Sequence, residues 1–202
     1  MKLFKMLSVG ALLLAGAVTH AQNPNGTTPS FGVKGGVNFA TVTGDDFDSP
    51  DSRTSFHVGA LVELPLNEMI SIQGEALYSG QGFKTDIPGG LLGGDEKVEY
   101  QLDYINVPVL VKAYVFQGLS LEAGPQFSFK VNEEFDSDAD ADSGDFDVNE
   151  AKDFEFGLAA GITFQTQMGL FASGRYNLGL TDIFENSDAK NSVFQIGVGY
   201  KF

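Results

Sequence analysis

Apolar and polar residues alternate along most of the chain from Phe31 onward. In residues 31–40 the odd positions are apolar or glycine, while Lys34 and Asn38 lie on the opposite face of an extended chain. A period of two is typical of β-strands that have one apolar and one polar face. The pattern recurs along the chain. The eight segments predicted as strands are 31–40, 54–64, 69–83, 98–114, 120–131, 153–164, 169–180 and 192–202.

The alternation changes phase inside the fourth segment. Apolar residues occupy even positions from Val98 to Tyr104 and odd positions from Ile105 to Ala113. A slip of one residue moves every following side chain to the other face of a strand. We therefore expect a β-bulge near Tyr104 and Ile105.

The connections between these segments alternate in length. Short turns on one side and long loops on the other are typical of outer-membrane β-barrels, whose strands have about ten residues. Residues 31–202 are therefore predicted to form an all-β domain, an eight-stranded antiparallel up-and-down transmembrane β-barrel. An even strand number would place both termini with the short turns in the periplasm, and the long loops outside the cell. The predicted loops are 42–53, 84–97, 132–152 and 182–191.

A soluble lipocalin-like barrel is the main alternative, because it also has eight strands. Such a barrel would turn its apolar face inward. Alternation alone does not say which face is inside. The apolar face is dense in aromatic residues near the strand ends, as the interfacial girdles of membrane barrels require, and this favours the outer membrane.

The N-terminal residues 1–21 are predicted to be a secretory signal peptide. Lys2 and Lys5 precede an apolar run at 7–18, and Thr19-His20-Ala21 offers small residues before a cut. The run is too short to span a bilayer as a helix. A retained N-terminal helix is the alternative. Residues 22–30 are expected to be a flexible leader.

Composition excludes several classes of function. The chain has no cysteine, which excludes a disulfide scaffold, a thiolate metal site, a cysteine nucleophile and a lipoprotein anchor. Its net charge of −15 argues against nucleic acid, which requires a basic surface. Of the two histidines, one lies in the predicted signal peptide, so a site with several histidine ligands is excluded.

Acidic and basic residues both fall on the predicted lumen face. The interior of an eight-stranded barrel is just wide enough for side chains to fill, and buried charges must be paired. We therefore expect a plug of salt bridges, with a narrow gated channel or proton path as the alternative. The predicted members are Lys34, Glu63, Glu75, Lys112, Glu122, Lys130, Asp153, Glu155, Arg175 and Lys201.

The predicted loop 132–152 is strongly acidic. Its alternating aspartates resemble the first half of a calcium-binding loop, but Ser143 stands where the turn glycine belongs and Asn149 where the final glutamate belongs. A solvated, self-repelling loop is the simpler interpretation. The weaker hypothesis is a calcium site formed by Asp138, Asp140, Asp142 and Asp145.

Ser55 and His57 are the serine–histidine pair that acyl transfer would need. They lie two residues apart on one strand face, which is the predicted lumen face, whereas a lipid-modifying site must reach lipid. The chain also has no Gly-x-Ser-x-Gly motif. We therefore predict that the protein is not an enzyme and that His57 is a hydrogen-bonded lumen residue.

Six stretches along the chain resemble the PorT-like family of outer-membrane barrels. This resemblance implies an eight-stranded barrel in the outer membrane of a Gram-negative bacterium. It implies no single activity, although the namesake branch serves protein secretion, and it carries over no functional residues. The stretches are FGVKGGVNFA (31–40), YINVPVLVK (104–112), GPQFSF (124–129), FGLAAGITF (156–164), RYNLGLTDI (175–183) and FQIGVGYKF (194–202).

Together these patterns predict a non-enzymatic, monomeric protein of the cell outer membrane, with a structural or surface-interaction role and no cofactor. Its predicted partners are outer-membrane lipid and lipopolysaccharide, with envelope or secretion proteins as further candidates and no nucleic acid. The alternatives are a PorT-like accessory to protein secretion, then a narrow gated channel, then a lipid-modifying enzyme.

Overall fold

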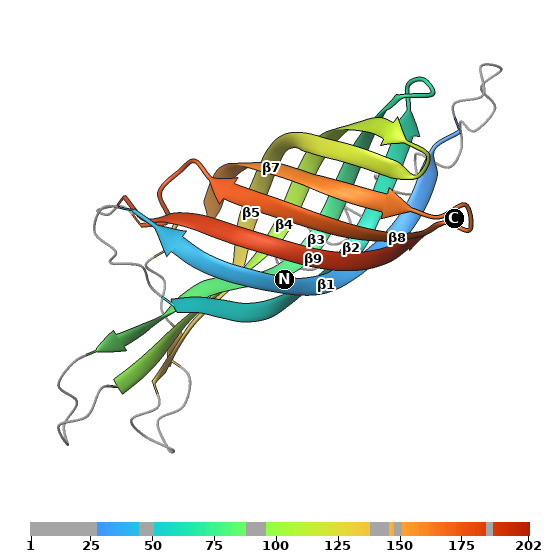
Figure 1. Ribbon diagram of the computed structural model, residues 1–202. Coiled ribbons are helices and arrows are strands. Elements are labelled where there is room, and N and C mark those ends of the chain that lie inside the picture. The colour runs from blue at the N-terminus through green and yellow to red at the C-terminus, as the bar shows by residue number, and fades with distance from the viewer. Residues whose placement is uncertain (1–27, 45–50, 88–95, 138–145, 148–150, 185–187) are drawn as a thin grey trace, which may run out of the picture.

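The computed structural model describes residues 28–44, 51–87, 96–137, 146–147, 151–184 and 188–202. Within these ranges, eight long antiparallel strands and the two-residue strand β6 form one barrel (Figure 1). No helix in the described part of the chain is long and apolar enough to cross a membrane. The strands are β1 (Ser30–Thr43), β2 (Asp51–Pro65), β3 (Ile70–Ile87), β4 (Glu96–Phe116), β5 (Leu119–Ser137), β6 (Phe146–Asp147), β7 (Phe154–Gln165), β8 (Leu170–Gly179) and β9 (Lys190–Lys201).

Hydrogen bonds between strands close the sheet on itself. The strand order is β4-β3-β2-β1-β9-β8-β7-β5-β6, and a further pairing of β4 with β5 joins the two sides. Every long strand therefore has two hydrogen-bonded neighbours, which leaves no long sheet edge to associate with other chains. The closed, eight-stranded antiparallel barrel predicted from the alternation is confirmed.

The two faces of the wall have opposite polarity. Phe56 and Val198, for example, point outward and are 56% and 65% exposed, whereas Arg175 points inward and is 1% exposed. A soluble barrel would have the reverse arrangement. Because a wall that is apolar outside and fully hydrogen-bonded within itself suits lipid, the structure excludes the lipocalin-like alternative.

The short turns and both ends of the described barrel lie together. Tight turns join β2 to β3, β4 to β5 and β7 to β8, and two of them contain glycines with positive φ, Gly118 (84°) and Gly169 (89°). Residues with a side chain rarely adopt that conformation. Phe31 and Phe202 bond to each other through their backbones at the same end, which is the right-hand end in Figure 1.

At the opposite end the wall is uneven in height. β3, β4 and β5 have 18, 21 and 19 residues, against 10 to 12 in β7, β8 and β9. The three longer strands extend beyond the rest of the barrel at the lower left of Figure 1. Three predicted loops are shorter than expected, because β2 begins at Asp51, β3 continues to Ile87 and β5 continues to Ser137.

The bulge expected in the fourth segment is wrong. In β4 the even positions point inward without interruption, from Tyr100 through Tyr104 to Lys112. The apolar residues change from even to odd positions because the lumen itself changes character along the strand. It is apolar near Tyr100 and polar near Lys112, while the face that each position occupies stays the same.

The irregularity lies in the neighbouring strand instead. Asp103 of β4 pairs with Asn132 of β5, but Tyr104 pairs with Lys130, so Val131 has no partner across the ladder. This extra residue shifts the alternation of β5 by one position. As a result Glu133 points into the barrel, although the regular alternation of the preceding residues, with even positions inward, would have placed it outside.

Candidate functional site in the barrel interior

Charged side chains from seven strands meet in the lumen and are buried. Each occupies an inward position of its strand, so the alternation that builds the wall also brings them together. We call this set the lumen charge network. It consists of Lys34 (β1), Glu63 (β2), Glu75 (β3), Lys112 (β4), Glu122 (β5), Arg175 (β8) and Lys201 (β9).

Arg175 is the centre of the network. Its Nη1 and Nη2 donate to the two carboxylate oxygens of Glu75 at 2.6 and 2.7 Å. Its Nε and Nη2 donate to Oε1 of Glu122 at 2.9 and 2.7 Å. Lys34 adds a second positive charge 3.8 Å from Glu75. A guanidinium that holds one carboxylate with two bonds fixes both distance and orientation, which an ammonium group cannot do.

Glu63 organises the part of the network nearer the short turns. Lys112 lies 3.4 Å from its carboxylate, and Lys201 and the Tyr114 hydroxyl also bond to it. Ser71 donates a further hydrogen bond of 2.6 Å. Lys112 connects the two halves of the network, because its Nζ also lies 4.0 Å from Glu122.

The network spans the lumen with three acids and four bases in mutual contact. Removing this many charges from water is costly unless each one is paired and hydrogen-bonded. Each member of the network has an opposite charge within 4.0 Å, and all of them except Lys34, whose Nζ has no hydrogen-bond partner, are also hydrogen-bonded. Chemically, this arrangement is a fixed polar core that joins opposite walls of the barrel.

The other three predicted members are placed differently. Lys130 lies nearer the long-loop end and binds Glu133 at 2.6 Å. Asp153 does not belong to the lumen, because its side chain is 90% exposed, although one oxygen lies 3.7 Å from Lys130. It precedes the first residue of β7, where the alternation does not yet apply. Glu155 is buried inside the barrel, apart from the network.

Two charged lumen residues were missed because they were assigned to loops. Arg53 is buried in β2 and donates to the Gln81 carbonyl at 2.8 Å. Glu133 is buried in β5 and accepts hydrogen bonds from the Tyr100 hydroxyl and the Ala151 backbone. Extending the alternation of residues 54–64 by one step would have found Arg53. Glu133 follows the bulge, for which its own segment gave no signal.

Ser55 and His57 both point into the barrel but do not bond to each other. The Ser55 hydroxyl donates to the Gly80 carbonyl at 2.5 Å. His57 Nδ1 lies 2.7 Å from Asn38 Oδ1, in a buried group of amides that includes Gln195. Nucleophilic catalysis needs the base to contact the hydroxyl, and this geometry provides no such contact.

An apolar cluster fills the lumen at the long-loop end. Residues just before β7 and just after β8 join this cluster, where Ala151 pairs with Phe184 and the Ile183 backbone donates to the Ala189 carbonyl at 2.7 Å. The lumen is therefore packed with apolar side chains at this end and with charges farther in. The buried members are Val42, Phe83, Tyr100, Leu102, Tyr104, Ala151, Ile183 and Ala189, with Phe184 packed against them.

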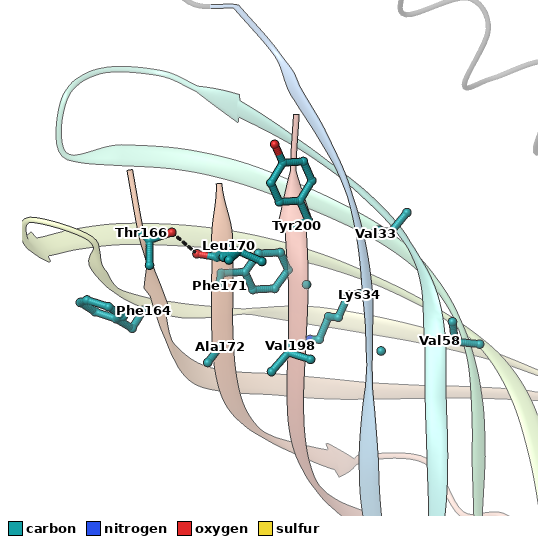
Figure 2. A pocket seen from close by; sticks show the side chains of 12 residues that line it. Val33, Lys34, Val58, Phe164, Thr166, Leu170, Phe171, Ala172, Val198 and Tyr200 are labelled. Atoms are coloured by element: carbon teal, nitrogen blue, oxygen red, sulfur yellow. Dashed lines mark hydrogen bonds between the residues drawn. The ribbon is translucent and has the colours of Figure 1, made fainter. Parts of the chain in front are cut away.

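The outer wall carries a shallow apolar groove of about 650 Å³ across β1, β2 and β7–β9. Figure 2 shows Val33, Val58 and Val198 along it, with Tyr200 near the end of β9. Thr166, whose hydroxyl donates to the Leu170 carbonyl at 3.0 Å, lies at the turn between β7 and β8. The groove is part of the apolar wall, and its lining residues have no arrangement that suggests chemistry.

The calcium hypothesis concerns residues that the structure does not describe. The hypothesised ligands Asp138, Asp140, Asp142 and Asp145 all lie outside the described residues. Among the residues that are described, no group of three or more histidine, aspartate or glutamate side chains could hold a metal ion.

Comparisons with known proteins agree with this architecture. A profile of the outer membrane protein beta-barrel domain family matches residues 20–185. No curated protein sequence matches the chain. The match covers most of the barrel, including every member of the lumen charge network except Lys201.

Solved structures provide a second comparison. Neisserial surface protein A is 12% identical, with 85% of this chain and 97% of that chain covered and a TM-score of 0.59. Ail, the attachment invasion locus protein of Yersinia pestis, crystallised with the heparin analogue sucrose octasulfate, is 11% identical, with 86% and 99% covered and a TM-score of 0.55. At such identities the likeness concerns the fold.

Proposed function

This chain belongs to the outer membrane protein beta-barrel domain family, and from that premise we propose that it is a closed, non-enzymatic barrel that acts through its exposed loops. In this proposal the lumen serves as a rigid core. The loops at the tall end of the wall present acidic side chains to cationic partners at the cell surface. The protein itself is a monomer without a cofactor.

The observation that carries this proposal is the filled lumen. Arg175, Glu75 and Glu122 occupy its centre with bonds of 2.6 to 2.9 Å, and an apolar cluster fills the mouth beyond them. An ion crossing the barrel would have to separate buried charge pairs, which is expensive in a low-dielectric interior. A closed scaffold therefore fits the geometry better than a gated channel or a proton path.

The direction of the barrel in the membrane follows from a general rule. Outer-membrane barrels have short periplasmic turns and longer extracellular loops. Here the short turns and both ends of the described barrel lie together, so we place them in the periplasm. The tall strands β3–β5 and their connections then face the exterior.

The loops determine the class of partner. Nineteen of the 27 acidic residues lie in the four predicted loops, nine of them in residues 132–152, although Glu133 among these points into the lumen. Ail was crystallised with an anionic heparin analogue, but an acidic rim would repel such a ligand and attract cationic surfaces. Divalent ions could also bridge these acids to the phosphates of lipopolysaccharide. We expect no binding to nucleic acid, for the same electrostatic reason.

A binding experiment with reconstituted protein tests the proposal. Proteoliposomes should bind a polylysine-coated surface but not a heparin-coated one, and about 0.5 M salt should abolish binding by screening. A variant in which Asp138, Asp140, Asp142 and Asp145 are all changed to Asn should bind polylysine more weakly. The matched control, Glu68→Gln, changes an exposed acid at the short-turn end and should leave it intact. Equal binding to heparin would contradict the proposal.

Two further measurements separate the alternative functions. Purified protein in a planar bilayer should show no conductance across a wide voltage range, and steady single-channel steps would instead support the gated channel.

The PorT-like secretion accessory is a narrower prediction from sequence resemblance. It requires that deleting the gene selectively removes exported proteins from the secretome, whereas a surface-interaction role requires an unchanged secretome.

The lipid-modifying enzyme is the last alternative. Its candidate nucleophile, Ser55, lies two residues from His57 on the same face of β2 but bonds to the Gly80 carbonyl instead. A Ser55→Ala variant should therefore leave the composition of lipid A unchanged. Altered lipid A in that variant would restore the enzymatic interpretation.

A further inference from the structure

Glu155 is a buried carboxylate with an unusual lack of positive charge around it. It points inward from the second residue of β7 and is 5% exposed. The side-chain amide of Asn191 donates a hydrogen bond to it. Glu63, Glu75, Glu122 and Glu133 each lie within 4 Å of a lysine or arginine nitrogen, whereas no ion pair reaches Glu155 in the described part of the chain.

Asn191, which bonds to Glu155, and Asn177 of the neighbouring strand β8 also have unused hydrogen-bonding atoms. Asn191 is 2% exposed, and its Oδ1 has no partner. Asn177 is 4% exposed, and neither its Oδ1 nor its Nδ2 has a partner. Buried amides are almost always satisfied by protein or by a bound molecule. Three unpartnered atoms next to one unpaired carboxylate therefore point to a ligand.

Glycines bring these three side chains to one place. A Cβ on Gly179 of β8 would lie 2.6 Å from the Glu155 Oε1 and 3.0 Å from the Asn191 backbone nitrogen. Asn177 lies on the same inward face of β8, two residues before Gly179 and thus roughly 7 Å from it along the strand. Gly157 of β7 pairs with Gly179. Because Gly179 has no side chain, the Glu155 carboxylate can lie against the wall beside Asn191.

The chemistry of this set matches one kind of ligand. Glu155 and the two amide Oδ1 atoms are oxygen donors, which hard cations prefer. A single carboxylate balances a single positive charge, whereas a divalent ion would leave an excess charge buried, at high cost. We propose that Glu155, Asn177 and Asn191 form a binding site for a monovalent metal cation of the sodium class inside the barrel.

The proposed site would join three neighbouring strands. Glu155, Asn177 and Asn191 belong to β7, β8 and β9, which are shorter than any of β1–β5. A cation held between them stabilises the folded barrel by mass action, because the unfolded chain does not assemble the site. The site is thus a structural one, and it does not depend on the proposed surface function.

The full chain in detergent micelles can be tested with sodium chloride against choline chloride at equal ionic strength. The protein should broaden the ²³Na resonance in sodium chloride, and sodium should raise the unfolding temperature by roughly 5 °C relative to choline. Glu155→Gln should abolish both effects. Asp153→Asn removes an exposed acid two residues away and should retain both.

A second variant distinguishes a loss of sodium binding in Glu155→Gln from a folding defect. Asn177→Ala keeps the carboxylate and should weaken sodium binding about tenfold, in line with the loss of one buried ligand. The proposal is overturned if sodium and choline act alike on the wild type, or if Glu155→Gln keeps the sodium effect. Identical behaviour in the two salts would mean that a proton neutralises Glu155. These outcomes are independent of polylysine binding and conductance.

Discussion

At the centre of the barrel, Arg175 of β8 bonds to two acids, Glu75 of β3 and Glu122 of β5. The bonds to Glu75 and Glu122 involve three of its nitrogens. Lysine could not replace it, because an ammonium group lacks the planar fork that matches a carboxylate. Serving both acids thus depends on the shape of this side chain as well as its charge.

Replacing Arg175 with Met should destabilise the barrel by about 3–5 kcal/mol, because it leaves buried carboxylates without their partner. Unfolding by urea in lipid vesicles measures this change. Adding Glu75→Gln and Glu122→Gln to the same chain should recover most of the loss, since a neutral interior carries no unpaired charge. Equal stability of Arg175→Met and wild type would show that the network contributes nothing.

At the scale of one strand, the outward residues of β9 show what the membrane requires. Phe194, Ile196, Val198 and Tyr200 are all exposed and alternate with inward residues. Ile196 lies near the middle of this strand, whereas Phe116 ends β4 at the short-turn end and is 77% exposed. The two positions differ in their depth in the bilayer and share an apolar outward side chain.

Ile196→Arg should therefore cost about 2–4 kcal/mol of unfolding free energy, and Phe116→Arg only about 0–1 kcal/mol, because the cost of a charge depends on depth. Urea titration of the two variants in vesicles compares them directly. A larger loss at Phe116 than at Ile196 would contradict the lipid-facing assignment of this wall.

The strands themselves could be predicted from sequence because a period of two is a local signal. Their faces could not always be predicted. Tyr100 and Leu102 are apolar yet lie in the lumen, where an apolar cluster fills the mouth, so hydrophobicity alone assigned them to the wrong side. The bulge at Val131 depends on pairing with β4, which is a non-local property.

The polar interior was predictable in composition and less so in its contacts. Alternation identified Arg175, Glu75 and Glu122 as inward residues, but not that one guanidinium holds both acids. Strand order and register determine which inward residues meet, and these emerge only when the sheet closes. The prediction that Asp153 lies in the lumen was wrong for a different reason, because this residue lies just before β7 begins.

The barrel has two different ends, the short-turn end and the long-loop end, and β3–β5 extend beyond the other strands at the long-loop end. The chain contains no cysteine, so a single introduced cysteine can report on each end without background. Asp188 lies at the long-loop end, just before β9, and Gln167 lies in the turn between β7 and β8. Both side chains are exposed.

Asp188→Cys should react with a membrane-impermeant maleimide in intact cells, because that end faces the exterior in our proposal. Gln167→Cys should react only after the outer membrane is permeabilised. Mass spectrometry of the purified protein measures both reactions. Labelling of Gln167→Cys alone in intact cells would reverse the orientation.

The hundred residues between Glu75 and Arg175 also bear on how the barrel is assembled. Neither residue can meet its partner until β8 has been synthesised and the hairpins at both ends of the chain have come together. A half-inserted sheet would expose unpaired charges to the hydrocarbon of the bilayer, at a cost of several kcal/mol for each charge. Such an intermediate is unstable in the membrane. We therefore expect the strands to insert and the barrel to close in one coupled, late step.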